Sequence, residues 1–215
     1  MHYVYSIRLF NIREDPKNNN KITAYLLSQA EDLSNLPWLA RISGSGSELL
    51  KFTSRTLVER TKIGTYIGCK ENNFMCWVKI RNDGMAGVVI TDDKYSERIA
   101  FNLIDRSMTR YESNPKSWDW SATDYDRVYG EMSDDLKDLI VKYQDPDKID
   151  SLSYCKNEIE KTKVKLYKSV DLILERGEKI EDLADKSADL SIRSKSFAKK
   201  AKKLNSWCPD GCILM

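Results

Sequence analysis

The sequence predicts an α+β fold: a five-stranded antiparallel sheet with flanking helices, followed by a long C-terminal coiled-coil helix. Two observations carry this prediction. Up to about residue 143, segments rich in β-forming residues alternate with helical patterns in the order strand, strand, helix, three strands, helix, helix. From about residue 150, glycine and proline almost vanish until residue 209, and layer-type residues recur at coiled-coil spacing.

The first elements are two strands and a helix. Strands are expected at 3–10 and near 21–28, because both segments are rich in β-formers and a proline- and asparagine-rich turn separates them. A helix is expected at about 48–61, after a flexible serine–glycine segment. Its inner face is expected to carry Leu57 and Arg60, together with other residues at three- and four-residue steps.

Three strands and two helices complete the N-terminal part. The strands are expected at 65–70, 74–81 and 85–91. A tight turn at Asp83-Gly84 should join the last two into a hairpin, because Asp-Gly supports the positive φ angles that such turns need. A helix capped by Ser96 should run to about Tyr111, and another helix is expected at 128–143.

The chain is expected to divide into four parts. Asp145-Pro146-Asp147 should end the N-terminal part, because proline and the residue before it resist continuing a helix. The expected boundaries are an N-terminal domain at 1–143, a linker at 144–151, a coiled-coil segment at 152–204 and a tail at 205–215.

Composition excludes several classes of protein. The formal net charge of +2 gives no reason to expect a nucleic-acid partner. No apolar run approaches the length that spans a bilayer, and the N-terminus lacks the pattern of a signal peptide, which indicates a cytosolic protein. In the cytosol the five cysteines should stay reduced, and their spacings do not form a zinc pattern.

The coiled-coil prediction depends on sixteen consecutive positions that alternate between steps of three and four residues, from Leu152 to Leu204. The large apolar layers are Leu152, Ile159, Leu166, Ile173, Ile180, Leu183, Leu190, Phe197 and Leu204. Several other layers are small or polar, so the helix should pair poorly with itself and should become ordered only when partner helices supply apolar surface.

The eighth layer is Arg176, which lies between aliphatic layers. A guanidinium buried in a bundle destabilises it by several kcal/mol unless acceptors satisfy its donors, so partner helices should offer carbonyl oxygens at the same height. Such a polar layer fixes register and partner choice. The alternative interpretation is an ordinary amphipathic helix with one arginine off its centre line.

Three stretches carry a family resemblance. Residues Leu172–Leu183 resemble the centre of an R-SNARE motif, whose arginine forms the ionic zero layer. The predicted hairpin at Arg81–Ile90 and the helix at Phe52–Arg60 resemble those of a longin domain. The chain is thus similar to the prenylated, synaptobrevin-like longin R-SNAREs.

The resemblance implies vesicle-membrane fusion in endomembrane trafficking through a four-helix bundle with three Q-SNARE helices (Qa, Qb and Qc), in which Arg176 meets glutamines. It also implies contact between the longin domain and the SNARE motif, which restrains the motif and shelters a lipid. Exposed apolar residues would contribute to that shelter or belong to the core: Leu36, Trp38, Leu39 and Ile42. The implied location is the cytosol and the cytoplasmic face of Golgi, vesicle and endosomal or vacuolar membranes.

The last four residues, Cys212-Ile213-Leu214-Met215, fit a C-a-a-X signal whose final methionine favours farnesyl. One such chain holds a protein only marginally at a membrane, so a second signal is needed. Cys208 is the candidate for a palmitoyl group, and six basic residues between Arg193 and Lys203 are a further candidate. The family's two cysteines are usually adjacent, whereas three residues separate them here; the alternative is a tail with incidental thiols.

Catalytic patterns are missing from the sequence. There is a single histidine, His2, and there is no phosphate-binding G-x-x-x-x-G-K-[ST] loop. We therefore expect no enzyme activity, no cofactor and no metal. The rival interpretation from another class is a prenylated trafficking adaptor, whose longin domain binds a coat or tether while the C-terminal helix only acts as a spacer.

Overall fold

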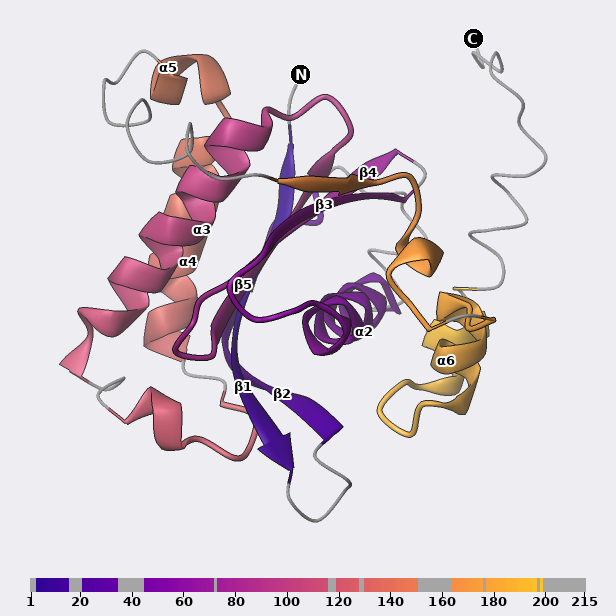
Figure 1. Cartoon of the computed structure of the whole chain (residues 1–215). Coiled ribbons are helices and arrows are strands. Elements are labelled where there is room, and N and C mark those ends of the chain that lie inside the picture. Colours follow the sequence, from indigo (N-terminus) through magenta and orange to yellow (C-terminus); the bar gives the residue numbers. More distant parts are fainter. Residues whose placement is uncertain are drawn as a thin grey trace, which may run out of the picture.

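The computed structural model describes residues 3–15, 21–34, 45–71, 73–115, 119–127, 130–150, 164–175, 177–196 and 198. Figure 1 shows a twisted sheet with helices on both of its faces. The expected α+β class is therefore confirmed.

The sheet has six strands, in the order β2-β1-β5-β4-β3-β6. Their bounds are Val4–Asp15 (β1), Lys21–Glu31 (β2), Tyr66–Glu71 (β3), Phe74–Ile80 (β4), Met85–Asp92 (β5) and Lys165–Tyr167 (β6). The first five pair antiparallel, as the sequence predicts. The sixth strand was not predicted: it comes from the expected coiled-coil segment and runs parallel to β3.

Helices cover the two faces of the sheet unequally. Helix α2 (Ser45–Arg60) lies on one face, and α3 (Glu97–Glu112) and α4 (Gly130–Tyr143) lie on the other (Figure 1). Ser96 occupies the N-cap position of α3, but its side chain makes no capping hydrogen bond. The break after α4 is confirmed, and Pro146 opens the short helix α5 (Pro146–Asp150), where its missing N–H costs nothing.

Two apolar clusters form the core, one on each face of the sheet. The first packs α3 and α4 against the sheet and includes Trp77, Phe101 and Ile104. The second packs α2 against the opposite face through Leu57 and Val58. Because side chains alternate along a strand, the central strand β5 supplies both clusters and is buried over almost its whole length.

The hairpin between β4 and β5 turns at Gly84, whose φ of +92° is the conformation that the Asp-Gly pair predicts. Further along β5, Gly87 lets α3 approach closely. A Cβ added at this position would lie 2.5 Å from Cγ2 of Ile104.

The segment expected to form one continuous helix over 152–204 adopts a different structure in its described part. It contains β6, the 3-10 helix η5 (Val170–Leu172), the helix α6 (Ile180–Lys186) and a helical turn at 192–196. Gly177, with a φ of +91°, turns the chain between η5 and α6. Without partner helices, the apolar side chains of this segment find their burial on the N-terminal domain instead.

Candidate functional site

The candidate functional site is the contact between the C-terminal segment, residues 164–198, and the N-terminal domain. Figure 1 shows the segment passing along the sheet edge at β3 and then beside α2, on the face of the sheet away from α3 and α4. Helix α2 is therefore covered on two sides. Ser54, Leu57 and Val58 are buried, while Phe52 and Thr56 line a groove with residues of the segment.

At the edge of the sheet, β6 extends the ladder of β3. Leu166 is opposite Gly68, and Tyr167 is opposite Cys69. The missing side chain of Gly68 makes room here, because a Cβ at this position would lie 2.8 Å from Cδ2 of Leu166 and 2.6 Å from Cζ3 of Trp77. Leu166 remains 65% exposed, so β6 is attached to β3 mainly by backbone pairing and only to a small extent by burial of this side chain.

The next residues close over the second core cluster. Val170 is fully buried in it, and its backbone N–H donates to Oε2 of Glu71 at 3.2 Å. Ser169 also donates to that carboxylate, at 3.5 Å, and accepts from the N–H of Asp171 at 3.2 Å, which caps η5. Burial raises the pKa of the Cys69 and Cys76 thiols in this cluster, so both stay protonated at neutral pH.

Three expected bundle layers contact the N-terminal domain: Ile173 and Ile180 pack against the second core cluster, and Leu183 lines the groove beside α2. Another expected layer, Leu190, is 6% exposed. The remaining expected site residues lie outside the described residues: Leu152, Ile159, Arg176, Phe197, Leu204, Cys208 and Cys212. The apolar shelter expected at Leu36, Trp38, Leu39 and Ile42 also lies outside them.

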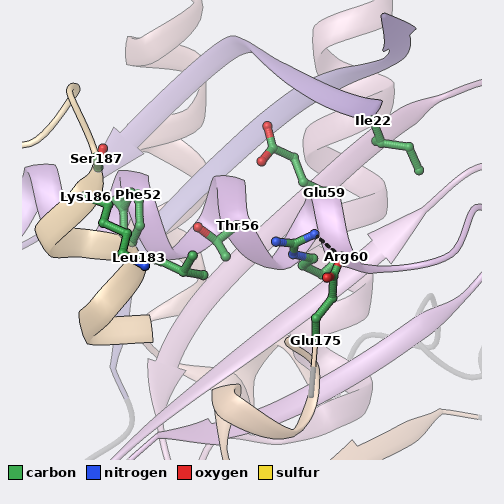
Figure 2. Close-up of a pocket in the computed structure, with 9 residues that line it drawn as sticks. All are labelled: Ile22, Phe52, Thr56, Glu59, Arg60, Glu175, Leu183, Lys186 and Ser187. Carbon is green, nitrogen blue, oxygen red and sulfur yellow. Dashed lines mark hydrogen bonds and ion pairs between the residues drawn. The ribbon is translucent and has the colours of Figure 1, made fainter. Parts of the chain in front are cut away.

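The groove between α2 and α6 has a volume of about 460 Å³. Figure 2 shows the side chains that line it: Phe52, Thr56, Glu59 and Arg60 from α2, Ile22 from β2, and Glu175, Leu183, Lys186 and Ser187 from the C-terminal segment. Ile22, Phe52 and Leu183 give it apolar walls, and two cations, Arg60 and Lys186, lie among its lining residues. The groove exists only while the C-terminal segment lies on α2, because both elements form its walls.

Charged and polar contacts join the two sides. Arg60 donates to Glu175 at 2.8 Å and to both carboxylate oxygens of Glu178 at 3.1 Å. Its guanidinium therefore points outward to the segment, whereas the sequence pattern placed Arg60 on the inner face of its helix. That expectation is wrong because these acidic residues, distant in sequence, supply acceptors on the outer side.

A second polar contact lies near the start of α2. Glu48 accepts from the backbone N–H of Ser191 at 3.0 Å and from the hydroxyl of Ser194 at 2.6 Å. These hydrogen bonds hold the pKa of the Glu48 carboxyl below its usual value of 4.5, with the Ser194 bond the largest cause. Nearby, Arg55 pairs with Asp189 at 3.3 Å and with Asp126 at 2.6 Å.

Sequence reasoning missed Val170, Glu48 and Glu71 as contact residues. For Val170 a signal was present, since it is an apolar residue beside a layer position and not on the seam. For the two carboxylates there was no signal, because the groups that donate to them are backbone N–H and hydroxyl groups of a segment more than ninety residues away.

Within the described residues, no helix combines the length and apolarity needed to cross a membrane.

Two family models match the chain. The longin model, described as a regulated-SNARE-like domain, matches residues 39–131, and the synaptobrevin model matches residues 151–208. A longin domain followed by a synaptobrevin segment defines a longin-domain R-SNARE, a non-enzymatic class of protein.

Curated relatives narrow the class. The chain is similar to the synaptobrevin homolog YKT6 of Debaryomyces hansenii, 38% identical over 85% of this chain and 90% of the relative. The corresponding protein of Yarrowia lipolytica is 34% identical over 88% and 93%, and that of Eremothecium gossypii is 34% identical over 95% and 98%. This chain belongs to the family of YKT6 synaptobrevin homologues, and it is an R-SNARE of membrane trafficking.

Proposed function

We propose that this chain fuses vesicles with endomembranes, and that its C-terminal segment binds either its own N-terminal domain or three Q-SNARE helices. In the closed form the segment lies on α2 and β3; in the active form residues 152–204 become one helix of a parallel bundle with three Q-SNARE helices. The observation that carries the proposal is the shared use of layer residues. Ile173, Ile180 and Leu183 are expected layers; the first two pack on the second core cluster here, and Leu183 lines the groove beside α2.

This shared use makes the two states mutually exclusive. A side chain that is covered by the longin domain cannot at the same time fill a layer of the bundle, so the longin domain competes with the Q-SNARE helices. Its affinity for the segment sets how often the chain is free to assemble. The energy for assembly comes from burying the sixteen layers together, which the closed form achieves only in part.

In the bundle, the zero layer is assigned to Arg176. Its guanidinium would donate to glutamine carbonyls of the three partner helices, and this buried polar layer would fix the register. Assembly from Leu152 toward Leu204 would draw the lipidated tail toward the opposing membrane. We place the chain in the cytosol and on the cytoplasmic face of Golgi, vesicle and endosomal or vacuolar membranes.

For membrane attachment, we assign a farnesyl group to Cys212 and a palmitoyl group to Cys208. The basic run from Arg193 would support both through attraction to anionic lipids. The apolar walls of the groove at Ile22, Phe52 and Leu183 support a shelter for the farnesyl chain in the closed form.

The test is to mix the full chain with three purified Q-SNARE helices. We expect a gain of helical circular dichroism and a complex that survives heating above the melting temperature of the separate chains. Ile180→Asp, at a layer, should abolish the complex. Ile192→Asp is the matched control, because Ile192 is 87% exposed in the closed form and lies off the seam. If the wild-type chain forms no such complex, the adaptor interpretation is favoured instead.

A further inference from the structure

The contacts of Arg60 differ from the apolar contacts because they are made with residues that lie outside the expected bundle layers. Ile173 and Ile180 are expected to be buried in both the closed form and the bundle, so they cannot by themselves favour either state strongly. Glu175 and Glu178, the partners of Arg60, lie off the seam. In a heptad whose layers are positions a and d, these two residues occupy positions c and f, which face away from the partner helices.

The same register reveals a stripe of acidic residues on the outer face of the helix. Every c and f position from 171 to 189 is acidic: Asp171, Glu175, Glu178, Asp182, Asp185 and Asp189. In the closed form, two arginines of α2 contact this stripe. Arg60 pairs with two of its members, and Arg55 pairs with Asp189.

We propose that the acidic stripe is the surface by which the longin domain recognises its own SNARE segment, with Arg60 as the main specificity-determining residue on α2. The proposal rests on the two-state function above and deepens it by naming the residues that set the closed state. The layers drive assembly with the Q-SNARE helices, whereas the stripe is read by the longin domain alone. The two recognition events therefore share the layer side chains Ile173 and Ile180, but only the contact with the longin domain also uses the stripe.

Burial identifies Glu178 as the stronger partner of Arg60. The side chains of Arg60 and Glu178 are 24% and 27% exposed, whereas Glu175 is 72% exposed. Water screens an exposed pair and leaves it nearly neutral in energy, while a sheltered guanidinium that contacts both carboxylate oxygens interacts more strongly. Arg55 contributes less to recognition, because its guanidinium also contacts Asp126 of its own domain at 2.6 Å.

The outer position of the stripe predicts an unusual mutational signature. A layer substitution changes both the closed form and the bundle. A charge reversal on the stripe or at Arg60 should weaken only the closed form, because these side chains would remain in water after assembly. Loss of the contact should therefore raise the rate of assembly and leave the stability of the assembled bundle unchanged.

The experiment uses the full chain and two separate readouts. Amide hydrogen exchange at residues 67–69 and 165–167 reports the pairing of β3 with β6 without any partner protein. The second readout is the rate of assembly with three Q-SNARE helices, followed by the melting temperature of the complex. Because the first readout needs no Q-SNARE, failure of this proposal is distinguishable from failure of the fusion function.

We expect Arg60→Glu to increase exchange at these amides and the assembly rate by about fivefold to tenfold, with an unchanged melting temperature of the complex. Lys62→Glu, which makes the same charge change at an exposed residue two positions away, should alter neither. Glu178→Arg should have the effect of Arg60→Glu without any substitution in the longin domain. Combining Arg60→Glu with Glu178→Arg should restore most of the protection, because the ion pair is re-formed with its charges exchanged.

Three results would overturn the proposal. Exchange in Arg60→Glu could equal that in Lys62→Glu, which would mean that the pair does not hold the segment. The combined variant could stay as open as each single variant, which would exclude a specific pair. Glu178→Arg could lower the melting temperature of the assembled complex, which would mean that the acidic stripe takes part in the bundle.

Discussion

The backbone N–H of Val170 donates to the carboxylate of Glu71, and the side chain of Val170 is fully buried in the second core cluster. This contact fixes the point where the C-terminal segment leaves the edge of β3 and turns toward α2. Val170 is not a layer residue, so its burial belongs to the closed form alone.

Val170→Ala should therefore shift the chain toward the open form. Removing two buried methyl groups costs roughly 1–3 kcal/mol, because the cavity is filled only in part. Hydrogen exchange at residues 165–167 should rise accordingly. Leu172→Ala is the control, since Leu172 belongs to the same short helix and is 62% exposed. Equal exchange in the two variants would show that Val170 does not anchor the segment.

The N-terminal domain contains a buried ion pair whose disruption should lower the stability of the domain. Arg8 is fully buried, pairs with Glu31, and donates to the hydroxyl of Ser6 at 2.8 Å. Burial lowers the pKa of Arg8 to about 10, so it remains charged at neutral pH. Glu31→Ala leaves this charge without its counterion.

The expected loss is about 2–4 kcal/mol in the free energy of unfolding of the longin domain, measured by urea denaturation. Asp135→Ala breaks the pair with Arg110, whose side chain is 61% exposed, and should leave stability almost unchanged. Equal losses in the two variants would contradict a special role for the buried pair.

Glu48 should give the closed form a dependence on acidic pH. Its pKa is lowered by hydrogen bonds from Ser194 and Ser191, so the carboxylate stabilises the contact at neutral pH. This contribution is present above the ordinary pKa of 4.5 and is lost as the pH falls through the lowered value. The protection of the Ser191 and Ser194 amides, corrected for the intrinsic pH dependence of exchange, should decrease as the pH falls below 4.5, and Glu48→Gln should remove this decrease.

The lipid assignment predicts that Cys212→Ser abolishes sedimentation of the expressed protein with membranes, and that Cys208→Ser weakens it. Met215→Leu is the control: it should exchange farnesyl for geranylgeranyl and preserve membrane binding. Mass spectrometry of the C-terminal peptide identifies the attached groups. Undiminished sedimentation of Cys212→Ser would exclude this cysteine as the anchor.

Much of the fold follows from local sequence. The alternation along β4 and β5 and the Asp83-Gly84 turn predict their hairpin, and the same kind of pattern predicts the five antiparallel strands. These signals are reliable because each segment suits only one structural environment. The strands suit a sheet that is packed on both faces, and the Asp-Gly pair suits a turn that needs positive φ.

The C-terminal segment differs because its sequence is suited to two environments. Ile173 and Ile180 fit a helical seam, yet they pack here on the longin domain. The heptad spacing predicts the helix that partner helices would stabilise, and it carries no signal for β6 or for the contact with Arg60. Those features depend on a surface assembled from α2 and β3, which local periodicity does not encode.

The central claim is that residues 152–204 serve as a bundle helix whose register is fixed by Arg176. The most direct measurement is the melting temperature of the complex formed with three Q-SNARE helices. Arg176→Gln should lower it, and replacing the matching glutamine of one partner helix by arginine should restore it, because one guanidinium again meets three amides. A complex that melts unchanged with Arg176→Gln, or that the partner substitution fails to restore, would contradict the account.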